Sequence, residues 1–407
     1  MSDGVIIVGA GHAAGQAVAS LRSEGYEGPI TVIGDEPYVP YQRPPLSKKF
    51  LAGEIDIDRV YFKPPDFYDK SQAEMLLGRK VVEVERPKKL VHLDDGSTRG
   101  YDKLILATGS RVRELNIPGF DLDGVFYLRT IEDVEAIQGK FKEGGKLVVV
   151  GGGYIGLEVA AVAAQRGIDV TVLEMAPRVL ARVVDPILSK FYTKAHSEAG
   201  VKIETGVTVS GFEGSDGKIE RIDCGDGKTF DADFAIVGVG IIPNVELADE
   251  AGLKVENGIV VDELCRTEDP DIYAIGDCTN HPNPILGSRL RLESVHNALE
   301  QGKTAAASIC GKEKPYAQVP WFWSDQYDLK LQIVGLSAGY DEVVVRGDPE
   351  NERSFAVFYL KDGVMIASDA VNRAPEHMMS RRLIAAKAKI PAAKLADESI
   401  NMKDMAE

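Results

Sequence analysis

Near its start the chain reads Val5-Ile6-Ile7-Val8-Gly9-Ala10-Gly11-His12-Ala13-Ala14. Its first four residues form an apolar β-branched run without alternation, which is typical of a parallel strand covered on both faces. Gly9, Gly11 and Ala14 then match the G-x-G-x-x-G/A turn. The first glycine permits the tight turn, the second lets backbone amides approach a pyrophosphate, and the small third residue lets helix pack on strand. Ala13 belongs to the same turn, so the stretch predicts a dinucleotide-binding strand–turn–helix.

The residues after this turn strengthen the prediction. The expected helix has an apolar face at helical spacing, formed by Ala14, Ala17, Val18 and Leu21. A second apolar strand, residues 30–33, leads into Asp35 and Glu36, where a carboxylate accepts hydrogen bonds from a ribose diol. The anion is expected at the positive end of the helix dipole. Strand, turn, helix, strand and acid together indicate nucleotide binding.

Composition places the chain among ordinary globular proteins. It has 407 residues, of which 44% are apolar and 27% charged, and this length suggests two or three domains. The net charge of −16 argues against nucleic acid as the main partner and fits an anionic membrane surface poorly. A local basic patch remains compatible with this charge.

No targeting or membrane segment is expected. The start of the chain lacks the basic and long apolar regions of a signal peptide. The longest apolar stretch, residues 147–164, contains the run Gly151-Gly152-Gly153 and Glu158, so a strand–turn–helix explains it better than a membrane span. We therefore expect a cytoplasmic protein.

The cysteines exclude several kinds of chemistry. They are Cys224, Cys265, Cys278 and Cys310, without a C-x-x-C pair, so neither structural disulfides nor a metal site is expected. A disulfide reductase needs two thiols from an early helix, and a thiol-type NADH peroxidase or oxidase needs one. No cysteine precedes Cys224, so both chemistries lack their nucleophile.

A second dinucleotide fingerprint begins near Lys146. Residues 147–150 predict a strand, and Gly151, Gly153 and Gly156 complete a G-x-G-x-x-G turn. The face of the following helix is assigned to Ile155, Val159 and Val162.

The strand of residues 169–173 ends at Glu174, close to the expected ~20 residues after the first glycine. An acid here accepts hydrogen bonds from both ribose hydroxyls and repels a 2′-phosphate, so NADH is favoured over NADPH. Arg178 and Arg182 lie close by, either near that phosphate position or on a solvated helix face.

Two fingerprints predict two nucleotides, most commonly a bound flavin and a diffusing nicotinamide. Residues 238–244 are expected to close the second unit, and the apolar strand of residues 271–277 to return the chain to the first domain. The predicted fold is α/β, with two Rossmann-like domains, the NAD domain being inserted into a split FAD domain, plus a small C-terminal α+β domain. The expected boundaries are 1–112 and 247–320 for the FAD domain, 113–246 for the NAD domain and 321–407 for the last.

Two further segments complete the chain. Prolines in residues 37–48 predict an extended loop, which is either a rigid surface loop or a carrier of Arg43 and Lys48 over the cofactor. In the last domain, residues 354–360 alternate, Asp362-Gly363 marks a hairpin, and a helix is expected from Pro375 to about Lys389.

Together these motifs resemble the FAD-dependent, NADH-using ferredoxin reductases of the glutathione reductase fold superfamily. The resemblance covers essentially the whole chain. Beyond the glycine turns it is carried by residues 37–48, 151–158, 274–278, 293–301 and 320–326, of which the last two are the most specific.

The resemblance implies FAD, NAD and a set of site residues. FAD would be held by Gly9, Gly11, Ala13 and Ala14, with Asp35 or Glu36 at the ribose, and by Arg43, Lys48, Val81, Arg129, Asp277 and Val295. Glu158 would pair with Lys48 beside the reactive nitrogen of the flavin, and Trp323 would lie near the ring on the ferredoxin side. Solvated charges are the alternative for the pair, and packing at a domain boundary for Trp323. His12 departs from the small or apolar residue expected after Gly11.

The implied activity is hydride transfer from NADH to FAD, followed by single-electron transfer to a two-iron, two-sulfur ferredoxin that feeds an oxygenase. Candidates for a basic docking patch are Arg289, Arg291, Lys330, Arg382 and Lys389, the last two expected on one helix face. Scattered solvated charges are the alternative. The rival function is an NAD(H)-responsive signalling flavoprotein like the distantly similar apoptosis-inducing factor.

Overall fold

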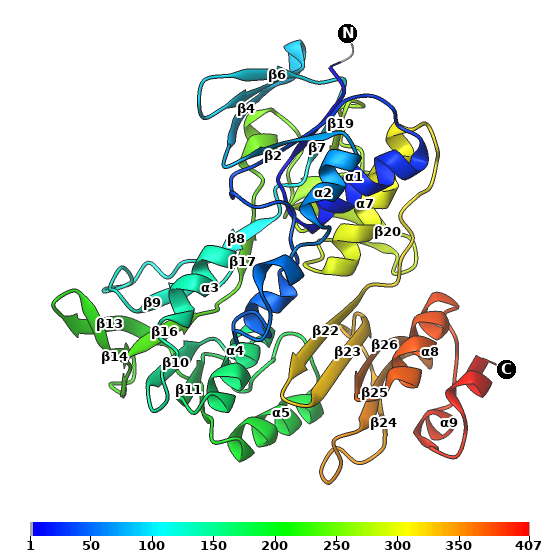
Figure 1. The fold of residues 1–407 in the computed structure, drawn as a ribbon. Helices are drawn as coiled ribbons and strands as arrows, with labels where there is room; N and C mark the ends of the chain where they lie inside the picture. Colours follow the sequence, from blue (N-terminus) through cyan, green and yellow to red (C-terminus); the bar gives the residue numbers. More distant parts are fainter. Residues whose placement is uncertain (1–2, 407) are drawn as a thin grey trace. The chain divides into compact units, whose positions relative to one another are not determined.

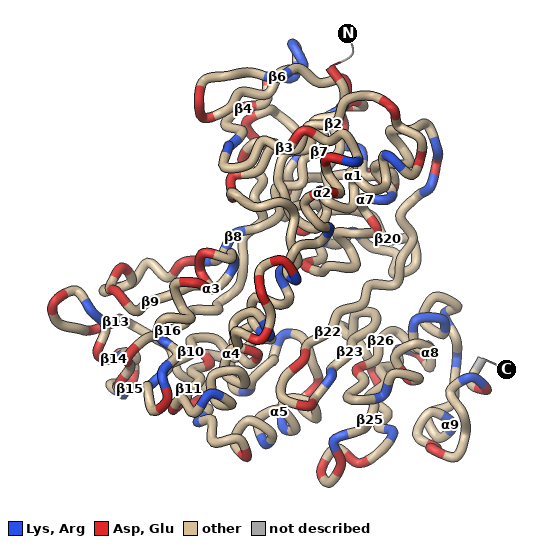
Figure 2. Tube along the Cα trace, in the orientation of Figure 1, with Lys and Arg blue, Asp and Glu red and all other residues tan. Residues whose placement is uncertain are grey.

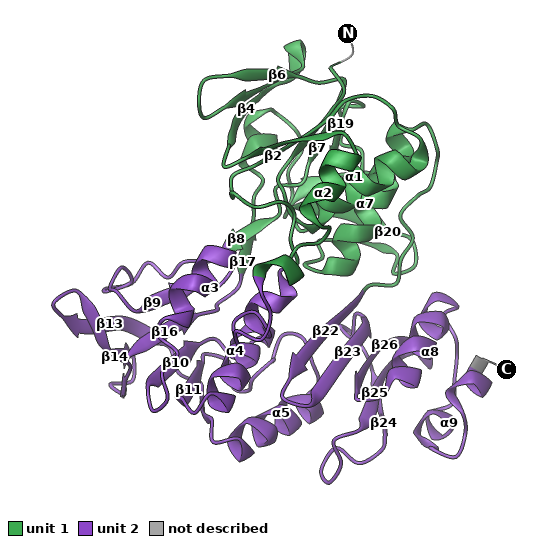
Figure 3. Cartoon of the chain, in the orientation of Figure 1, with its two compact units in different colours: residues 1–42, 57–111, 241–320 green, residues 43–56, 112–240, 321–407 purple. Residues whose placement is uncertain are grey.

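The computed structural model describes residues 3–406. The chain divides into two compact units (Figure 3). Unit 1 comprises residues 1–42, 57–111 and 241–320, and unit 2 comprises residues 43–56, 112–240 and 321–407. Within residues 3–406, every helix is too short or too polar to be a membrane span.

Unit 1 is built on a five-stranded parallel sheet with the order β19-β7-β1-β2-β3. The strands are β1 (Val5–Val8), β2 (Ile30–Gly34), β3 (Ala73–Leu77), β7 (Lys103–Leu106) and β19 (Ile272–Ala274). β1 is central and buried along its length, as its lack of alternation predicts. Since β19 pairs with β7, the late apolar strand returns to the first sheet as expected.

Two helices of unit 1, α1 (His12–Glu24) and α7 (Val295–Ile309), pack against each other (Figure 1). The predicted face of α1 is confirmed, because Ala14, Ala17, Val18 and Leu21 are completely buried. The smaller elements of unit 1 are β4 (Val81–Glu85), β5 (Leu90–Leu93), β6 (Thr98–Gly100), β18 (Ile259–Val260), β20 (Thr279–Asn283), β21 (Ser288–Leu290), α2 (Pro65–Lys70) and α6 (Glu246–Glu250). The short strands β8 (Ser110–Val112) and β17 (Ile241–Pro243) pair with each other.

Unit 2 repeats the parallel arrangement, with the order β12-β11-β10-β16-β9. The strands are β9 (Val125–Tyr127), β10 (Lys146–Val150), β11 (Asp169–Glu174), β12 (Lys202–Thr205) and β16 (Phe234–Val237), and the helices of this part are α3 (Ile131–Gln138), α4 (Tyr154–Gln165) and α5 (Pro186–Glu198). An antiparallel sheet of β13 (Val209–Ser215), β14 (Lys218–Cys224) and β15 (Thr229–Asp231) accompanies them.

The predicted face of α4 is partly wrong. Val159 is buried, but Ile155 is 43% exposed and Val162 is half-buried. The helix begins at Tyr154, and its buried residues include Gly156, Leu157 and Glu158 instead. A helix covered on several sides has no single apolar stripe, so helical spacing alone selects the wrong positions.

The C-terminal part of unit 2 is a five-stranded antiparallel sheet with the order β22-β23-β26-β25-β24. Its elements are β22 (Trp321–Gln326), β23 (Leu329–Gly335), β24 (Glu342–Arg346), β25 (Phe355–Lys361), β26 (Val364–Val371), α8 (Ala374–Ala385) and α9 (Ala392–Ala396). The α/β fold with a small α+β domain is thus confirmed, and so is the hairpin at Asp362-Gly363.

Two predictions for this part need correction. The alternation over 354–360 predicts one exposed face, yet β25 is buried from Phe355 to Leu360 because neighbouring strands and side chains cover it fully. The helix expected from Pro375 to about Lys389 is α8, which ends at Ala385, and Lys387 adopts a left-handed backbone with φ 50°. Lys389 therefore lies in a bridge opposite Val364 and does not share a helix face with Arg382.

A buried carboxyl in this sheet gives a prediction for stability. Asp369 on β26 is 2% exposed and accepts a hydrogen bond from the Tyr359 hydroxyl at 2.5 Å. Burial raises its pKa to about 7, the Tyr359 hydrogen bond opposes this, and the charge of Asp185 adds to it. The unfolded chain loses this proton near pH 4, whereas the folded protein keeps it up to about pH 7. The free energy of unfolding should therefore fall as the pH rises from about 4 to 7, and Asp369 should change it little above pH 7.

We expect Asp369→Asn to remove this pH-dependent part of the free energy of unfolding. The variant should be more stable than the parent protein by roughly 4 kcal/mol at pH 8 and by only about 1 kcal/mol at pH 4.5. Urea unfolding of both proteins across this range measures the difference, which isolates Asp369 from other titrating groups. Equal pH slopes for the two proteins would refute the prediction.

Candidate functional site

The first glycine turn, in unit 1, has the geometry of an anion site. Gly9 has φ +105°, and a Cβ there would lie 2.2 Å from the Ala107 carbonyl oxygen. A Cβ on Gly11 would meet nothing within 4 Å, so the turn is open at this residue. Gly11 is also the N-cap of α1, which has no side-chain cap and no acidic residue in its first turn. These features fit a nucleotide pyrophosphate at the start of α1.

The two candidate ribose acids differ in their surroundings. Asp35, just after β2, is exposed, whereas Glu36 is half-buried and accepts a hydrogen bond from the Tyr41 hydroxyl at 2.5 Å. Asp35 is therefore the more accessible acceptor for a ribose hydroxyl. The ring of His12 makes an edge contact with Phe62, with ring centroids 5.7 Å apart, at the start of α1.

A second segment of unit 1 lies close to the turn. A Cβ on Gly276 would lie 3.4 Å from the Cβ of Ala13, so the residues after β19 approach the start of α1. Asp277 follows and accepts a hydrogen bond from the Ser110 hydroxyl at 3.0 Å. The structure thus brings the first turn and the neighbourhood of Asp277 to the same end of one parallel sheet, where open α/β sheets bind ligands.

Two other predicted cofactor residues of unit 1 lie at the starts of α7 and β4. Val295 is the first residue of α7, directly after the N-cap Ser294, and is half-buried. Val81 begins β4 and is 3% exposed within the hydrophobic core that also contains Leu93. Packing accounts for the Val81 side chain without a ligand.

The second turn, in unit 2, repeats the geometry of the first. Gly151 has φ +111°, and a Cβ there would lie 2.4 Å from the Gly238 carbonyl oxygen. Gly153 is open within 4 Å and is the N-cap of α4, again without a side-chain cap or an acid in the first turn. A Cβ on Gly156 would lie 2.1 Å from the Gly151 carbonyl oxygen, which explains the third glycine.

Glu174 is fixed beside this turn. Its carboxylate accepts hydrogen bonds from the backbone amides of Gly152 and Ala176, each at 2.7 Å. Arg178 donates to the Val184 and Ala181 carbonyls and to Ser189, so its guanidinium is engaged within the fold. Arg182 is exposed. Glu174, which the sequence predicts to favour NADH, is therefore held in place at the second turn.

We expect kcat/KM for NADH to exceed that for NADPH by roughly 100-fold, because like charges placed together cost several kcal/mol. Glu174→Gln should reduce this ratio, and Arg182→Ala should leave it unchanged. Steady-state kinetics with both nucleotides measure the ratio. A higher efficiency with NADPH would overturn the assignment.

The proline-rich loop holds two of the predicted residues in unit 2. It is not extended throughout, because Pro44–Ser47 form a 3₁₀ turn, η1, for which the fixed φ of proline is well suited. The Arg43 guanidinium donates to the Arg129 carbonyl at 2.5 Å. The Arg129 amide donates in turn to Asp133, whose side chain caps α3. Arg43 and Arg129 are thus brought together.

Lys48 and Glu158 form a buried ion pair in unit 2. The Lys48 Nζ lies 2.6 Å from the Glu158 Oε2, and the two side chains are 16% and 1% exposed. Ser47 donates to the same oxygen at 2.5 Å, and Ser324 donates to Oε1 at 2.6 Å. Burial raises the pKa of Glu158, and Lys48 and the two hydroxyls oppose this rise. The two serines were missed from the sequence, although both lie in quoted motifs.

Trp323 lies beside Ser324 on β22, so the two side chains point to opposite faces of the sheet. It is partly exposed and stacks at a tilt on Trp321, with centroids 5.5 Å apart. The ring centroid of Trp321 lies 5.5 Å from the ring centroid of His377 and 5.5 Å from the Cζ of Arg381. Trp323 is therefore an accessible aromatic side chain on a packed aromatic base.

The candidate basic residues are distributed over both units. Lysines and arginines in general occur along the whole chain (Figure 2). In unit 1, Arg289 donates to Asn280 and to the Val261 carbonyl, and Arg291 pairs with Glu293. In unit 2 the remaining candidates, Lys330, Arg382 and Lys389, are exposed.

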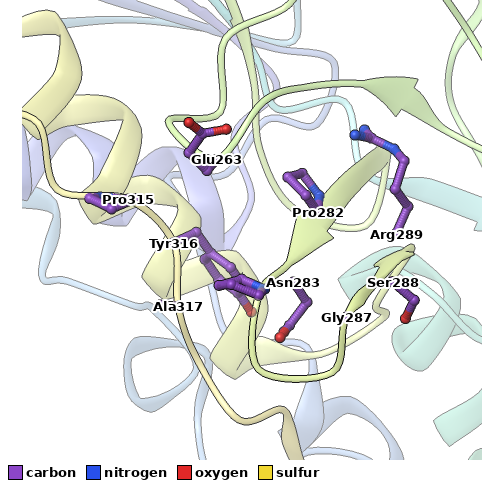
Figure 4. A pocket seen from close by; sticks show the side chains of 10 residues that line it. Glu263, Pro282, Asn283, Gly287, Ser288, Arg289, Pro315, Tyr316 and Ala317 are labelled. Carbon is purple, nitrogen blue, oxygen red and sulfur yellow. The ribbon is translucent and has the colours of Figure 1, made fainter.

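A hollow of about 650 Å³ in unit 1 has none of the predicted cofactor residues in its lining (Figure 4). It is lined by Glu263, Pro282, Asn283, Pro284, Gly287, Ser288, Arg289, Pro315, Tyr316 and Ala317. Among the described residues, no three His, Cys, Asp or Glu side chains are placed to hold a metal ion. The four cysteines are free thiols, and burial raises the pKa of Cys278, next to Asp277.

Comparison with known proteins gives consistent results over the whole chain. The family model of the pyridine nucleotide-disulphide oxidoreductases matches residues 3–302, and a reductase C-terminal model matches residues 321–406. Putidaredoxin reductase of Pseudomonas putida is 44% identical, covering 99% of this chain and 97% of its own. The ferredoxin–NAD(+) reductase component of the anthranilate 1,2-dioxygenase system of Burkholderia cepacia is 42% identical over 99% of both chains. The crystal structure of a covalent putidaredoxin reductase–putidaredoxin complex matches with a TM-score of 0.96 and 43% identity, covering 99% of this chain and 97% of that one.

Proposed function

Since the chain belongs to the pyridine nucleotide-disulphide oxidoreductase family, we propose that it is an FAD-dependent reductase that passes electrons from NADH to a ferredoxin. The observation that carries this proposal is the absence of any cysteine before Cys224 in a chain with two open glycine turns. Such a chain binds two nucleotides and has no early thiol for disulfide chemistry. The names of its relatives supply the acceptor class.

The residues present fit FAD and NAD(H). FAD, when bound, supplies hydride acceptance from NADH and single-electron release. In unit 1 the residues proposed to hold it are Gly9, Gly11, Ala13, Ala14, Asp35, Glu36, Asp277 and Val295, with Val81 the weakest candidate. In unit 2 they are Arg43, Lys48 and Arg129, and those proposed for NAD(H) are Gly151, Gly153, Gly156 and Glu174.

The proposed roles of these residues are to bind, orient and supply charge. The amides at the starts of α1 and α4 bind phosphates, and Glu174 selects the ribose without a 2′-phosphate. Glu158 fixes the Lys48 ammonium, which places a positive charge where negative charge develops on reduction. Trp323 is proposed to lie between the cofactor and the acceptor protein. No general acid or base is required for hydride transfer.

We propose a two-iron, two-sulfur ferredoxin as the acceptor, with an oxygenase behind it. Docking is proposed to use basic residues, the exposed Lys330, Arg382 and Lys389 being the more available candidates, because Arg289 and Arg291 are engaged within unit 1. The cytoplasmic location and the four-part domain boundaries stay predictions.

Electrostatic docking predicts a dependence on ionic strength. Ferredoxin-dependent turnover should weaken as salt rises from low to moderate concentration, because screening shortens the reach of surface charges to about 10 Å at 0.1 M. Reduction of a small uncharged acceptor by the same protein should not change, and serves as the control. Turnover with ferredoxin that is independent of salt would refute basic docking.

The function itself is tested by NADH-dependent reduction of cytochrome c. We expect rapid reduction only when a ferredoxin is added, since cytochrome c reports electrons that have left the reductase. Slow reduction of the flavin followed by a stable dimer, without ferredoxin-dependent turnover, would favour the signalling alternative.

A further inference from the structure

The buried carboxylate of Glu158 is the end point of a longer polar chain within unit 2. Ser324 donates to Glu158, and the Gln326 amide nitrogen donates to the Ser324 hydroxyl at 3.1 Å. The Gln326 amide oxygen contacts His196 Nε2 at 2.8 Å, and His196 Nδ1 contacts the Tyr327 hydroxyl at 3.0 Å. Ser324, Gln326 and His196 are each at most 1% exposed.

The direction of every hydrogen bond in this chain is determined by its chemistry. An amide oxygen only accepts, so His196 Nε2 carries the hydrogen. Burial lowers the pKa of His196, so the ring is neutral and Nδ1 accepts from Tyr327. The single hydrogen of the Ser324 hydroxyl then points to the carboxylate. All donors therefore point one way, from Tyr327 towards Glu158, and aligned hydrogen bonds polarise one another.

The chain links separate elements of unit 2. Glu158 lies on α4 and His196 on α5, while Ser324 and Gln326 lie two residues apart on β22 and so share a face of the strand. A primary amide does not relay protons by simple exchange, so a route for protons through Gln326 is excluded. What the chain transmits is orientation and partial charge.

We propose that Ser324, Gln326 and His196 are positioning residues that form a one-way hydrogen-bond chain keeping the buried Glu158 charged, so that it holds Lys48 in place. The proposal rests on the proposed function only for the use made of Lys48. The Glu158 carboxylate has two further donors, Ser47 and Lys48, and both of them contact Oε2. Ser324 is the donor to Oε1, so its removal leaves that oxygen without this compensation for burial.

Other titratable groups near Glu158 do not replace this compensation. Tyr154 on α4 and Tyr192 on α5 interact electrostatically with Glu158. Burial raises the pKa of both hydroxyls well above the usual value. Asp369 on β26 and Asp325 on β22 act on these tyrosines with negative charge. Lys48 is the cation among the groups that act on Glu158 within the described residues.

The test is the titration of the Glu158 carboxyl in the FAD-loaded protein, monitored by ¹³C NMR. The Glu158→Gln variant, in which the signal of this carboxyl is missing, assigns the resonance. Ser324→Ala should raise the midpoint by about 1–2 pH units, the equivalent of one hydrogen bond to a charged group. Ser324→Thr, which keeps the hydroxyl, should restore the midpoint. Ser368→Ala is the matched control, because Ser368 is also fully buried in this sheet but its hydroxyl has no partner among the described residues.

Gln326→Met offers a second variant if Ser324→Ala does not fold. This substitution preserves the side-chain volume and interrupts the hydrogen-bond chain one residue further from Glu158. The midpoint of the Glu158 titration should therefore rise by a smaller amount, about half a pH unit. The pH profile of flavin reduction by NADH should move with the midpoint in each variant. A midpoint unchanged in both Ser324→Ala and Gln326→Met, or moved equally by Ser368→Ala, overturns the proposal. Failure of the parent protein to reduce a ferredoxin, with the midpoints moving as expected, overturns the proposed function alone.

Discussion

Replacing Lys48 with methionine is expected to lower the free energy of unfolding by about 3–5 kcal/mol and to abolish most NADH-dependent turnover. Glu158 is 1% exposed, so without Lys48 its carboxylate is left buried with the Ser47 and Ser324 hydroxyls as its remaining side-chain donors within residues 3–406. The carboxyl then either stays charged at high cost or takes up a proton. Urea unfolding and steady-state turnover of the FAD-loaded protein measure the two effects.

Two variants separate stability from activity. Lys48→Met combined with Glu158→Leu should recover most of the stability, because an apolar pair can replace a buried ion pair, but it should not recover turnover. Lys190→Met is the surface control: the Lys190 and Glu350 side chains are 77% and 69% exposed, so its loss should cost less than about 1 kcal/mol. A Lys48→Met protein that retains parental turnover would remove Lys48 from the proposed mechanism.

The second large effect concerns the glycines of the NAD turn. Gly153→Ala should fold with nearly unchanged stability, because a Cβ there meets no protein atom within 4 Å. It should nevertheless weaken NADH binding at least ~10-fold, since the methyl group occupies the space through which the pyrophosphate approaches the backbone. Gly156→Ala should instead destabilise the protein by about 2 kcal/mol or more, because its Cβ would lie 2.1 Å from the Gly151 carbonyl oxygen.

Apparent KM for NADH and urea unfolding of each variant distinguish these two outcomes. Gly139→Ala is a matched control, because Gly139 has an ordinary helical backbone and the nearest atom to its Cβ would be 3.9 Å away. This variant should change neither quantity. If Gly153→Ala bound NADH as tightly as the parent protein, the pyrophosphate would not lie at this turn.

The sequence predicts the parallel cores well because β1 and β10 are short, apolar and followed by glycines whose geometry has few alternatives. The face of α1 is predicted correctly because one side of that helix is buried. Ile155 on α4 is mispredicted because that helix is covered on several sides and its apolar residues carry little directional information. The end of α8 before Lys389 depends on the left-handed backbone of Lys387, for which lysine gives no signal.

The candidate site shows the same division. The glycines and Glu174 follow from spacing along the chain, because each acts through local backbone geometry. Glu158 and Lys48 follow from a family resemblance, and the structure places them 2.6 Å apart. Ser324 and His196 are far from Glu158 in sequence. Their contribution depends on the packing of β22 against α4 and on the contact of His196, on α5, with Gln326 of β22. No local pattern indicates that a buried serine donates to a distant carboxylate.

The most direct test of the account is an anaerobic titration of the purified protein with NADH, monitored by visible absorbance. Oxidised ferredoxin is added after the flavin has been reduced. We expect the flavin colour to bleach with about one equivalent of NADH and to return with about two equivalents of ferredoxin, because ferredoxin accepts one electron at a time. Cys278→Ala should behave in the same way. A protein that takes up no flavin, or whose reduction by NADH requires a thiol, would contradict the account.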